Sequence, residues 1–400
     1  MISDRLHIVQ TAAFPFPTRQ GSQVYVSGMA SALAKRGHRV TVACYGYGDG
    51  EVDPGIDLRT VPVPENYRNL RAGPDWVKPF LDVRLARLLC DLAPEADILH
   101  AHNYEAPLAA YVARRLHGTP VIYNNHNTMR EELHRYFKNP ALRGLARWAG
   151  LGLDLSIPRR ADACVAISQA AQPLLENLGC SNVHHIPPGI DPVDFVGADR
   201  ARGRKAADLD GRVWVVYAGN PDSYQDLEVL VDAIMRDESL GLLMVSASPL
   251  SDWERRASAL PLARKRFVQT SSWSATKDLI AAADIAALPR AVCSGYPIKL
   301  LNYLALGLPT VCVKGSSRPL AGIVTTPNGD VPAFQSALRT LAEEQQRRES
   351  LGMAGAEFVR THCSWDSRAR DLEFLYEQVL TEKSNRRQRS LPRIRASQHA

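Results

Sequence analysis

The chain has 400 residues, of which 45% are hydrophobic and 22% are charged, proportions typical of a soluble globular protein. This length exceeds that of one ordinary core, so two domains are expected. The N-terminus, MISDRLHIVQ, lacks the basic start and apolar run of a signal peptide, and no apolar run reaches the roughly 18 residues of a membrane-spanning helix. These features predict a cytoplasmic protein.

The seven cysteines are scattered, mostly in apolar runs, and no CxxC pair occurs. Reduced core thiols fit this distribution better than a disulfide framework or a zinc site. No Ser-His-Asp elbow or P-loop occurs either. These absences argue against hydrolase, NTPase and redox chemistry.

The net charge of +6 is concentrated at the C-terminus, where residues 383–400 hold six cations and no acid. The rest of the chain is balanced, which argues against a nucleic-acid partner. The 383–400 tail is expected to be basic and disordered. It could serve solubility, or it could contact anionic lipid or an acidic partner.

In chain order, the apolar run 6–14 predicts a strand, and a loop containing Gly21 leads into a helix that ends at Gly37. A second strand is expected at 38–45, which completes a β-loop-α-β unit. The same alternation of strands and helices continues to about residue 190 and restarts at residue 212. The segment 331–362 reads as helical throughout.

The fold class is therefore α/β, with two tandem Rossmann-like domains and a ligand site expected in a cleft between them. Apolar periodicity is lost and charge rises where a linker is placed. The predicted parts are an N-terminal domain at 1–195, a linker at 196–211, a C-terminal domain at 212–363, an amphipathic helix at 364–381 and the basic tail at 383–400.

Gly21 stands where the first strand turns into a helix, and free helix-terminal amides suit a phosphate. This loop is not the GxGxxG of dinucleotide-binding proteins. The cluster YGYGDG at 45–50 opens no helix and reads as a plain loop. A simple turn remains the alternative for Gly21.

Histidines end two predicted strands, in HAHN at 100–103 and in NNHNTM at 124–129. No carboxylate or cysteine completes a metal set, so no metal is expected. Hydrogen bonding at the sheet edge would explain His100 and His102. His126 lies in a run that reads as too polar for a core, which makes it the better functional candidate.

The stretch CSGYPIKLLNYLALGLPTV at 293–311 places a Gly-x-Pro turn before a helix. Amides of the helix N-terminus together with Lys299 would form an anion site. Asn302, about one turn further, could hold a sugar hydroxyl. The alternative is an ordinary exposed lysine.

Taken together, these motifs resemble the retaining GT-B glycosyltransferases of the large family 4 group. The resemblance covers about residues 5–380. It rests on the Gly21 loop, ADILHAHN, HNTM, VAISQAAQPLLENLG followed by IPPGID, YAGNPDSYQDLEVLV, GYPIKLLNYLALGLPTV and SWDSRARDLEFLYEQVL.

The resemblance implies a nucleotide-sugar donor, a hydroxyl acceptor (glycan, lipid-linked or small molecule), no metal or other cofactor, and retention by front-side attack. A hexose is the implied sugar. It also implies that Gly21 approaches the diphosphate and that His126 contacts the donor sugar. The turn of Ser294, Gly295, Pro297 and Ile298 would wrap the sugar and phosphate.

The sequence departs from the family pattern in two places. Ser294 and Asn302 stand where the family usually has two glutamates, the second of which holds the ribose. Asn220 and Tyr224 lie where the family has an Arg and a Lys on the diphosphate. Lys299 is then expected to neutralise more of the phosphate charge.

The Arg-rich amphipathic segment 129–160 is expected to meet the acceptor or a membrane surface, which would make the protein peripheral to the membrane. A solvated structural helix is the alternative. Two other functions stay open at this point: a nucleotide-sugar epimerase of the same fold, and a non-catalytic binding or scaffold protein.

Overall fold

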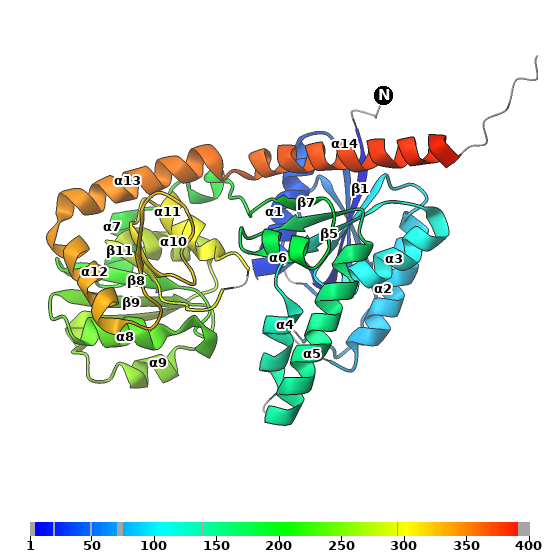
Figure 1. Ribbon diagram of the computed structural model, residues 1–400. Coiled ribbons are helices and arrows are strands. Elements are labelled where there is room, and N and C mark those ends of the chain that lie inside the picture. The colour runs from blue at the N-terminus through cyan, green and yellow to red at the C-terminus, as the bar shows by residue number, and fades with distance from the viewer. Residues whose placement is uncertain are drawn as a thin grey trace, which may run out of the picture. The chain divides into compact units, whose positions relative to one another are not determined.

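The computed structural model describes residues 5–18, 21–48, 50–69, 75–137, 139–293 and 295–390 (Figure 1). The chain forms two compact units. The first ends at Pro188 and resumes at Trp365, and the second is Gly189–Ser364. The first unit therefore ends earlier in the chain than the expected boundary at residue 195.

The first unit is built on a parallel sheet, with seven strands among its described residues in the order β3-β2-β1-β4-β5-β6-β7. Most of its strands are buried along their whole length, because helices cover both faces of the sheet. The strands are β1 His7–Pro15, β2 Arg39–Tyr45, β3 Ile56–Val61, β4 Ile98–His102, β5 Val121–Asn125, β6 Ala163–Ala166 and β7 Val183–His185.

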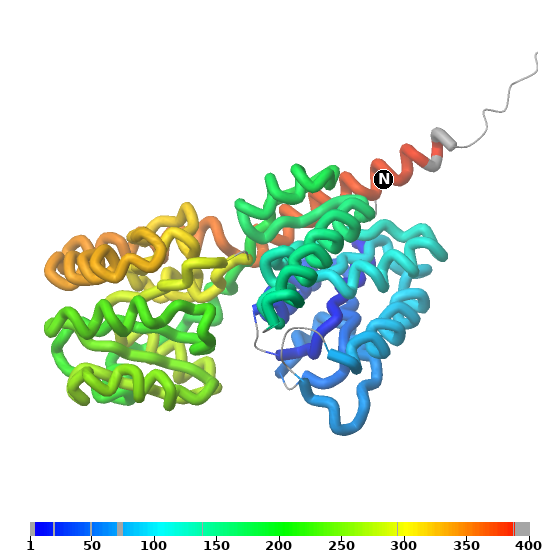
Figure 2. Tube along the Cα trace, turned by 60° about the horizontal axis from the view of Figure 1, so that its bottom comes forward, coloured from blue at the N-terminus to red at the C-terminus, as the bar shows by residue number. Residues whose placement is uncertain are grey.

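Helices α2 (Lys78–Leu92) and α3 (Glu105–His117) lie side by side on one face of this sheet (Figure 2). Helices α1 (Gly21–Lys35) and α14 (Trp365–Ser390) cover the other face. The strand connections contain α4 Met129–Glu132, η1 Leu133–Tyr136, α5 Pro140–Ser156, η2 Pro158–Arg160 and α6 Ala171–Asn177.

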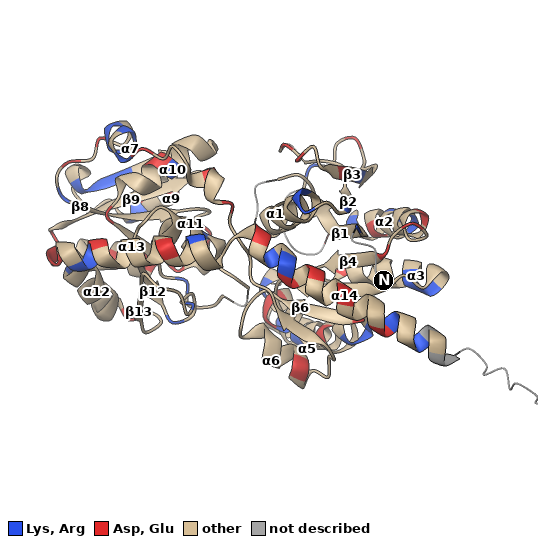
Figure 3. Cartoon of the chain, turned by 90° about the horizontal axis from the view of Figure 1, so that it is seen from above, with Lys and Arg blue, Asp and Glu red and all other residues tan. Residues whose placement is uncertain are grey.

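Helix α14 completes the first unit from the C-terminal end of the chain. The Tyr376 hydroxyl lies 2.7 Å from His100 Nδ1, and Arg36 pairs with Asp366 and Glu373. Charges of both signs follow its exposed side (Figure 3). The helix continues to Ser390, so the expectation of a disordered tail from residue 383 is wrong for 383–390, where Glu382 and Arg386 form an i,i+4 pair. Residues 391–400 lie outside the described part.

The second unit has a parallel sheet of six described strands in the order β10-β9-β8-β11-β12-β13. Its core strands are continuous apolar runs because both faces are covered. The strands are β8 Val213–Ala218, β9 Leu240–Ser246, β10 Lys265–Gln269, β11 Ile285–Leu288, β12 Thr310–Val313 and β13 Ile323–Thr326.

Two apolar clusters hold the helices of the second unit against opposite faces of this sheet. One face carries α8 Leu227–Met235, α9 Ser251–Arg256 and α12 Val331–Glu343. The other carries α7 Arg200–Ala206, α10 Trp273–Ala282 and α11 Ile298–Ala305. Helix α13 is Gln345–His362, and short 3-10 turns are η3 Pro192–Phe195, η4 Ser223–Gln225 and η5 Leu262–Arg264.

Several elements differ from the expectation. The expected linker contains α7, which is capped by the Asp199 side chain and joined to α10 by a 2.5 Å ion pair between Arg202 and Asp278. The expected helix at 331–362 is two helices, which meet at Glu344. No helix within the described ranges combines the length and apolarity needed to cross a bilayer.

Gly28 lies where α1 contacts α14, and a Cβ at this position would come within 2.2 Å of the Trp365 ring. Gly28→Val is therefore expected to lower the free energy of unfolding by about 2–3 kcal/mol, because the ring has to move. Chemical denaturation measures this change.

The control is Gly144→Ala in α5, where nothing lies within 4 Å of an added Cβ. This change should raise stability by about 0.5–1 kcal/mol. Equal effects of the two substitutions would contradict the packing of α14 on α1.

Candidate functional site

The clearest site-like feature is the carboxyl edge of β8 and β11 in the second unit. These strands are neighbours, yet β8 leads to β9 on one side and β11 leads to β12 on the other. Such a point, where the strand order reverses, opens a crevice beyond the strand ends and is the usual ligand position in parallel sheets. The loops after both strands and the start of α11 meet there.

Lys299 and Tyr303 project from the same side of α11 because they are four residues apart. The Tyr303 hydroxyl accepts a 2.8 Å hydrogen bond from the Ala218 amide at the end of β8. Lys299 Nζ donates to the Tyr217 hydroxyl at 2.6 Å and lies 4.7 Å from the centre of that ring. Tyr303 thus fixes helix α11 to β8, and Lys299 lies at the carboxyl end of this strand.

Gly219 makes room for the lysine. Its φ of +144° lies in a region that favours glycine. A Cβ there would lie 2.1 Å from Lys299 Cε. A glycine is therefore required at position 219, because of its backbone conformation and because the Lys299 side chain packs against it.

Asn220 organises the loop after β8. Its Oδ1 accepts from Gln225 Nε2 at 2.8 Å and from Lys299 Nζ at 3.4 Å. Its Nδ2 donates to Asp222 at 2.7 Å and to the Tyr224 hydroxyl at 2.6 Å. All four hydrogen-bonding positions of the amide are used, so in this state Asn220 holds the lysine, and its direct contact with a ligand stays a prediction.

Arg290 is a second cation at this site, and the sequence analysis did not identify it. It follows β11 by two residues, and its guanidinium lies 4.9 Å from the centre of the Tyr224 ring. The signal was present in the sequence, as a basic residue directly after the buried strand DIAALP. Lys299 is therefore not the only cation that the described residues place at these strand ends.

Lys299 and Arg290 both bring positive charge to the site, and the charge of Asp222 also acts on Lys299. Within the described ranges, no carboxylate forms an ion pair with Lys299 or Arg290. Burial, and then the charge of Arg290, lower the pKa of Lys299 from 10.5 to about 7. An anion bound beside the lysine would raise this pKa again.

The Arg318 side chain stabilises the turn before α11. Arg318 Nη2 donates to the carbonyl oxygens of Gly295 at 2.7 Å and Cys293 at 3.2 Å. Pro297 is the N-cap of α11, and Ile298 is its first residue. Ser294 lies outside the described residues.

Asn302 lies on α11 and is half-buried. Its side chain makes no hydrogen bond to another described residue, whereas its backbone carbonyl accepts from the Leu306 amide. The amide group is thus available to a ligand hydroxyl.

In the first unit, the histidines form a buried polar cluster. His102 Nδ1 lies 3.1 Å from His126 Nε2, so one of the two rings donates to the other. His100 contacts Asn124 at 3.1 Å and Tyr376 at 2.7 Å. The expectation that the run around His126 is too polar for a core is wrong: His126 is 3% exposed, because His102 and the Tyr25 ring pack against it.

Burial keeps these rings neutral. It lowers the pKa of His126 to about 3 and that of His100 to about 4. His102 Nε2 and the Asn124 amide nitrogen are buried without a partner among the described residues. Gly21 is the exposed first residue of α1. No group of three metal-ligating side chains occurs in the described part of the chain.

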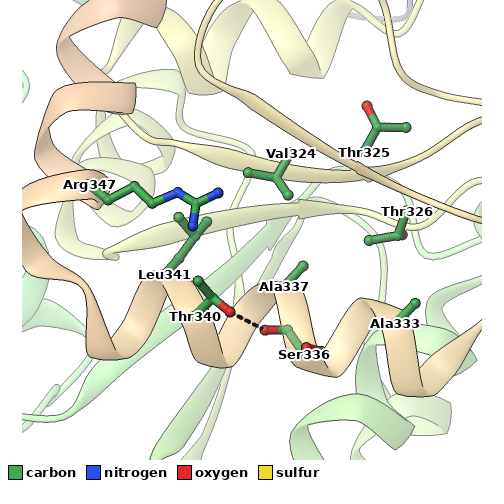
Figure 4. Close-up of a pocket in the computed structure, with 9 residues that line it drawn as sticks. All are labelled: Val324, Thr325, Thr326, Ala333, Ser336, Ala337, Thr340, Leu341 and Arg347. Atoms are coloured by element: carbon green, nitrogen blue, oxygen red, sulfur yellow. Dashed lines mark hydrogen bonds between the residues drawn. The ribbon is translucent and has the colours of Figure 1, made fainter.

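A separate pocket of about 300 Å³ lies between β13 and α12, at the far edge of the second sheet (Figure 4). Its lining is mostly methyl and hydroxyl groups, with Arg347 at one end. Thr340 Oγ1 donates to the Ser336 carbonyl at 2.9 Å. None of the residues proposed from the sequence lines this pocket.

Comparison with known proteins agrees with this architecture. Residues 19–194 match the family described as Glycosyltransferase Family 4, and residues 212–344 match Glycosyl transferases group 1. A phosphatidyl-myo-inositol mannosyltransferase of Mycobacterium leprae is 25% identical, and the alignment covers 95% of this chain and 98% of that protein. An MMP alpha-(1->4)-mannosyltransferase of Mycolicibacterium hassiacum is 23% identical, over 90% and 95% of the two chains.

Solved structures show the same fold. A sucrose-phosphate synthase from Thermosynechococcus elongatus superposes with a TM-score of 0.78 at 16% identity, over 94% of this chain and all of the other. Anabaena HepE in complex with UDP gives 0.71 at 13% identity, over 93% of this chain and all of the other. Two parallel α/β units of this kind define the GT-B class of glycosyltransferases. With both halves matched, the chain belongs to the family 4, group 1 glycosyltransferases.

Lys299 also predicts a pH-dependent stability. Because its pKa of about 7 in the fold is below that of an unfolded lysine, the unfolded chain binds more protons from about pH 7 to pH 10. The unfavourable contribution of Lys299 is therefore complete below pH 7 and disappears as the pH rises. Replacing Lys299 by Met removes this cost, so the variant should be more stable than wild type by a larger margin at about pH 6 than at pH 9. The two margins should differ by on the order of 1 kcal/mol in the free energy of unfolding, after allowance for the partial exposure of Lys299.

Urea unfolding at the two pH values measures the difference. Lys314→Met, which replaces an exposed lysine, is the control and should show no such change. If Lys299→Met behaved like this control, the ammonium would not be desolvated in the free protein.

Proposed function

We propose that this glycosyltransferase moves a hexose from a nucleoside-diphosphate sugar to a hydroxyl acceptor, with retention and without a metal. The observation that carries the proposal is the pair Lys299 and Arg290. The two cations stand at the strand ends beside the N-terminus of α11, and the charge of Asp222 is the carboxylate charge that acts on Lys299. A diphosphate is the ligand that best matches two fixed cations and free helix amides.

The comparisons support the choice of donor. Structures with the same fold are described in complex with UDP, with UDP-glucose and with ADP. The two curated relatives are named as mannosyltransferases. A hexose, with mannose as the first to test, is therefore the donor sugar that we propose.

Each residue has a role in the proposal. Lys299, Arg290 and the first amides of α11 neutralise the diphosphate, and Asn302 holds the ribose. The turn from Ser294 to Ile298 encloses the sugar-linked phosphate. Gly21 and His126 of the first unit serve the phosphate and the sugar.

The chemical step exchanges one bond for another at the anomeric carbon. The bond from this carbon to the phosphate oxygen breaks, and a bond to the acceptor oxygen forms on the same face of the sugar. The acceptor proton passes to the departing phosphate oxygen. Lys299 and Arg290 stabilise the charge that develops there, and side chains supply the charge that a divalent metal would otherwise provide.

A panel of nucleotide sugars, including GDP-mannose, UDP-glucose and ADP-glucose, tests the proposal. One donor should raise the melting temperature and release free nucleotide slowly without acceptor, in the presence of EDTA. Lys299→Ala and Arg290→Ala should each lower kcat/KM for that donor by about a hundredfold or more, because each removes charge stabilisation worth roughly 3 kcal/mol.

Lys205→Ala, an exposed lysine on α7, is the control and should keep full activity. Binding without turnover for every donor, with glycan and lipid acceptors added, would contradict the proposal and support the scaffold alternative. Conversion of the donor into an epimer without acceptor would instead show an epimerase.

We also propose that the acceptor lies at a membrane surface, reached through α5. Leu145 and Trp148 on this helix are 68% and 74% exposed, with Arg143 and Arg147 beside them. An exposed apolar stripe with flanking cations suits an anionic lipid surface. The name of the Mycobacterium leprae relative includes a lipid, phosphatidyl-myo-inositol, which supports this proposal.

Vesicle co-sedimentation tests this part. The double change Leu145→Ser and Trp148→Ser should weaken binding to phosphatidylglycerol vesicles by more than about tenfold, since each side chain contributes roughly 2 kcal/mol when buried. The matched control is Phe80→Ser with Val83→Ser, which removes two exposed apolar residues from α2. Loss of binding only when residues 383–400 are deleted would assign the contact to the basic tail.

A further inference from the structure

Two of the seven cysteines lie in contact in the first unit. Cys164 is on β6, and Cys180 follows α6. Both belong to one buried apolar cluster that includes Tyr123 and Leu175, where the Cys164 thiol also donates to the Pro158 carbonyl at 3.5 Å. Both are free thiols.

The backbone holds the two residues in place. The Cys164 amide donates to the Asn182 carbonyl at 3.0 Å, and Cys164 pairs with Val183 in the parallel ladder of β6 and β7. The Cys180 amide donates to the Leu175 carbonyl at 3.0 Å, which closes α6. Cys180 therefore lies in the turn that leads into β7, the strand that pairs with β6 at Cys164.

The two thiols are chemically unequal. Arg159 of η2 donates from Nε to the Leu178 carbonyl, and this guanidinium lies against Gly179, next to Cys180. The neighbouring Cys164 thiol, and against the effect of burial also the charge of Arg159, lower the pKa of Cys180, whereas the Cys180 thiol and burial raise the pKa of Cys164. Cys180 is also 8% exposed against 1% for Cys164, so it is the sulfur that a small oxidant reaches first.

We propose that Cys164 and Cys180 form a peroxide-oxidisable dithiol, in which Cys180 attacks and Cys164 resolves. The Cys180 thiolate attacks hydrogen peroxide, which leaves a sulfenic acid on Cys180 and releases hydroxide. The Cys164 thiol then displaces water from this sulfenic acid and forms the disulfide. Two thiols are oxidised, and one peroxide is reduced to two waters.

The disulfide would join the middle of β6 to the turn after α6. Strand β6 pairs with β5, where Asn125 is opposite Ala166, and His126 follows directly. Oxidation thus acts on the strand next to the histidine cluster. The other buried thiols provide a contrast, because Cys44 and Cys312 have no cysteine partner and burial raises the pKa of each.

The test measures the thiols of the intact protein before and after hydrogen peroxide. Alkylation under denaturing conditions should fall from the seven free thiols to five, with a mass loss of two hydrogens. A peptide linking Cys164 to Cys180 should appear, and dithiothreitol should restore all the thiols. Unchanged alkylation at all seven positions, or a disulfide that maps elsewhere, would overturn the proposal.

Variants separate the two roles. Cys164→Ser should leave a sulfenic acid on Cys180 that reacts with dimedone, and Cys180→Ser should abolish the disulfide. Arg159→Gln should slow its formation several-fold, with Arg159→Lys restoring most of the rate. Cys90→Ser, at a half-buried cysteine on α2, is the control and should leave the disulfide unchanged. Equal rates for Arg159→Gln and wild type would contradict the assignment of Cys180 as the attacking thiol.

Discussion

The contact between the Lys299 ammonium and the Tyr217 phenol determines how the second unit presents its charge. An ammonium removed from water is costly unless it is compensated, and here a hydroxyl, an aromatic face and the Asn220 amide compensate it only in part. The Gly219 conformation, the Tyr303 anchor and the four hydrogen bonds of Asn220 all serve to hold this one side chain. The fold therefore holds a desolvated lysine whose charged form a bound anion would stabilise.

Much of the fold was predicted from the sequence. The elements that were missed lack a continuous or periodic apolar pattern. Strands such as β8 and β9 are buried on both faces and read as unbroken apolar runs. β3 and β13 were not predicted, because each is an edge strand that is partly exposed and its polar residues interrupt the apolar run. The segment of α7 was predicted to be a linker because its charged residues show no apolar periodicity. The helix is joined to α10 by an ion pair, which such a pattern does not reveal.

The candidate site was less predictable, because it depends on side chains from separate loops. Lys299 was identified from one continuous motif. Arg290 was missed because its importance comes from adjacency to the β8 loop, 65 or more positions away in the chain, where it stacks on Tyr224. The polar run at His126 was predicted to lie outside the core, but it is buried. Its partners His102 and Tyr25 come from other elements, and together these side chains form a polar part of the core.

Helix α14 makes the first unit discontinuous in the chain. His100, on a central strand, has its hydroxyl partner at Tyr376, and Gly28 on α1 packs against Trp365. During synthesis the second unit leaves the ribosome whole, while the first still lacks one covering helix until almost the last residue is made. The order of completion is thus the reverse of the order of translation, since the unit begun first is finished last.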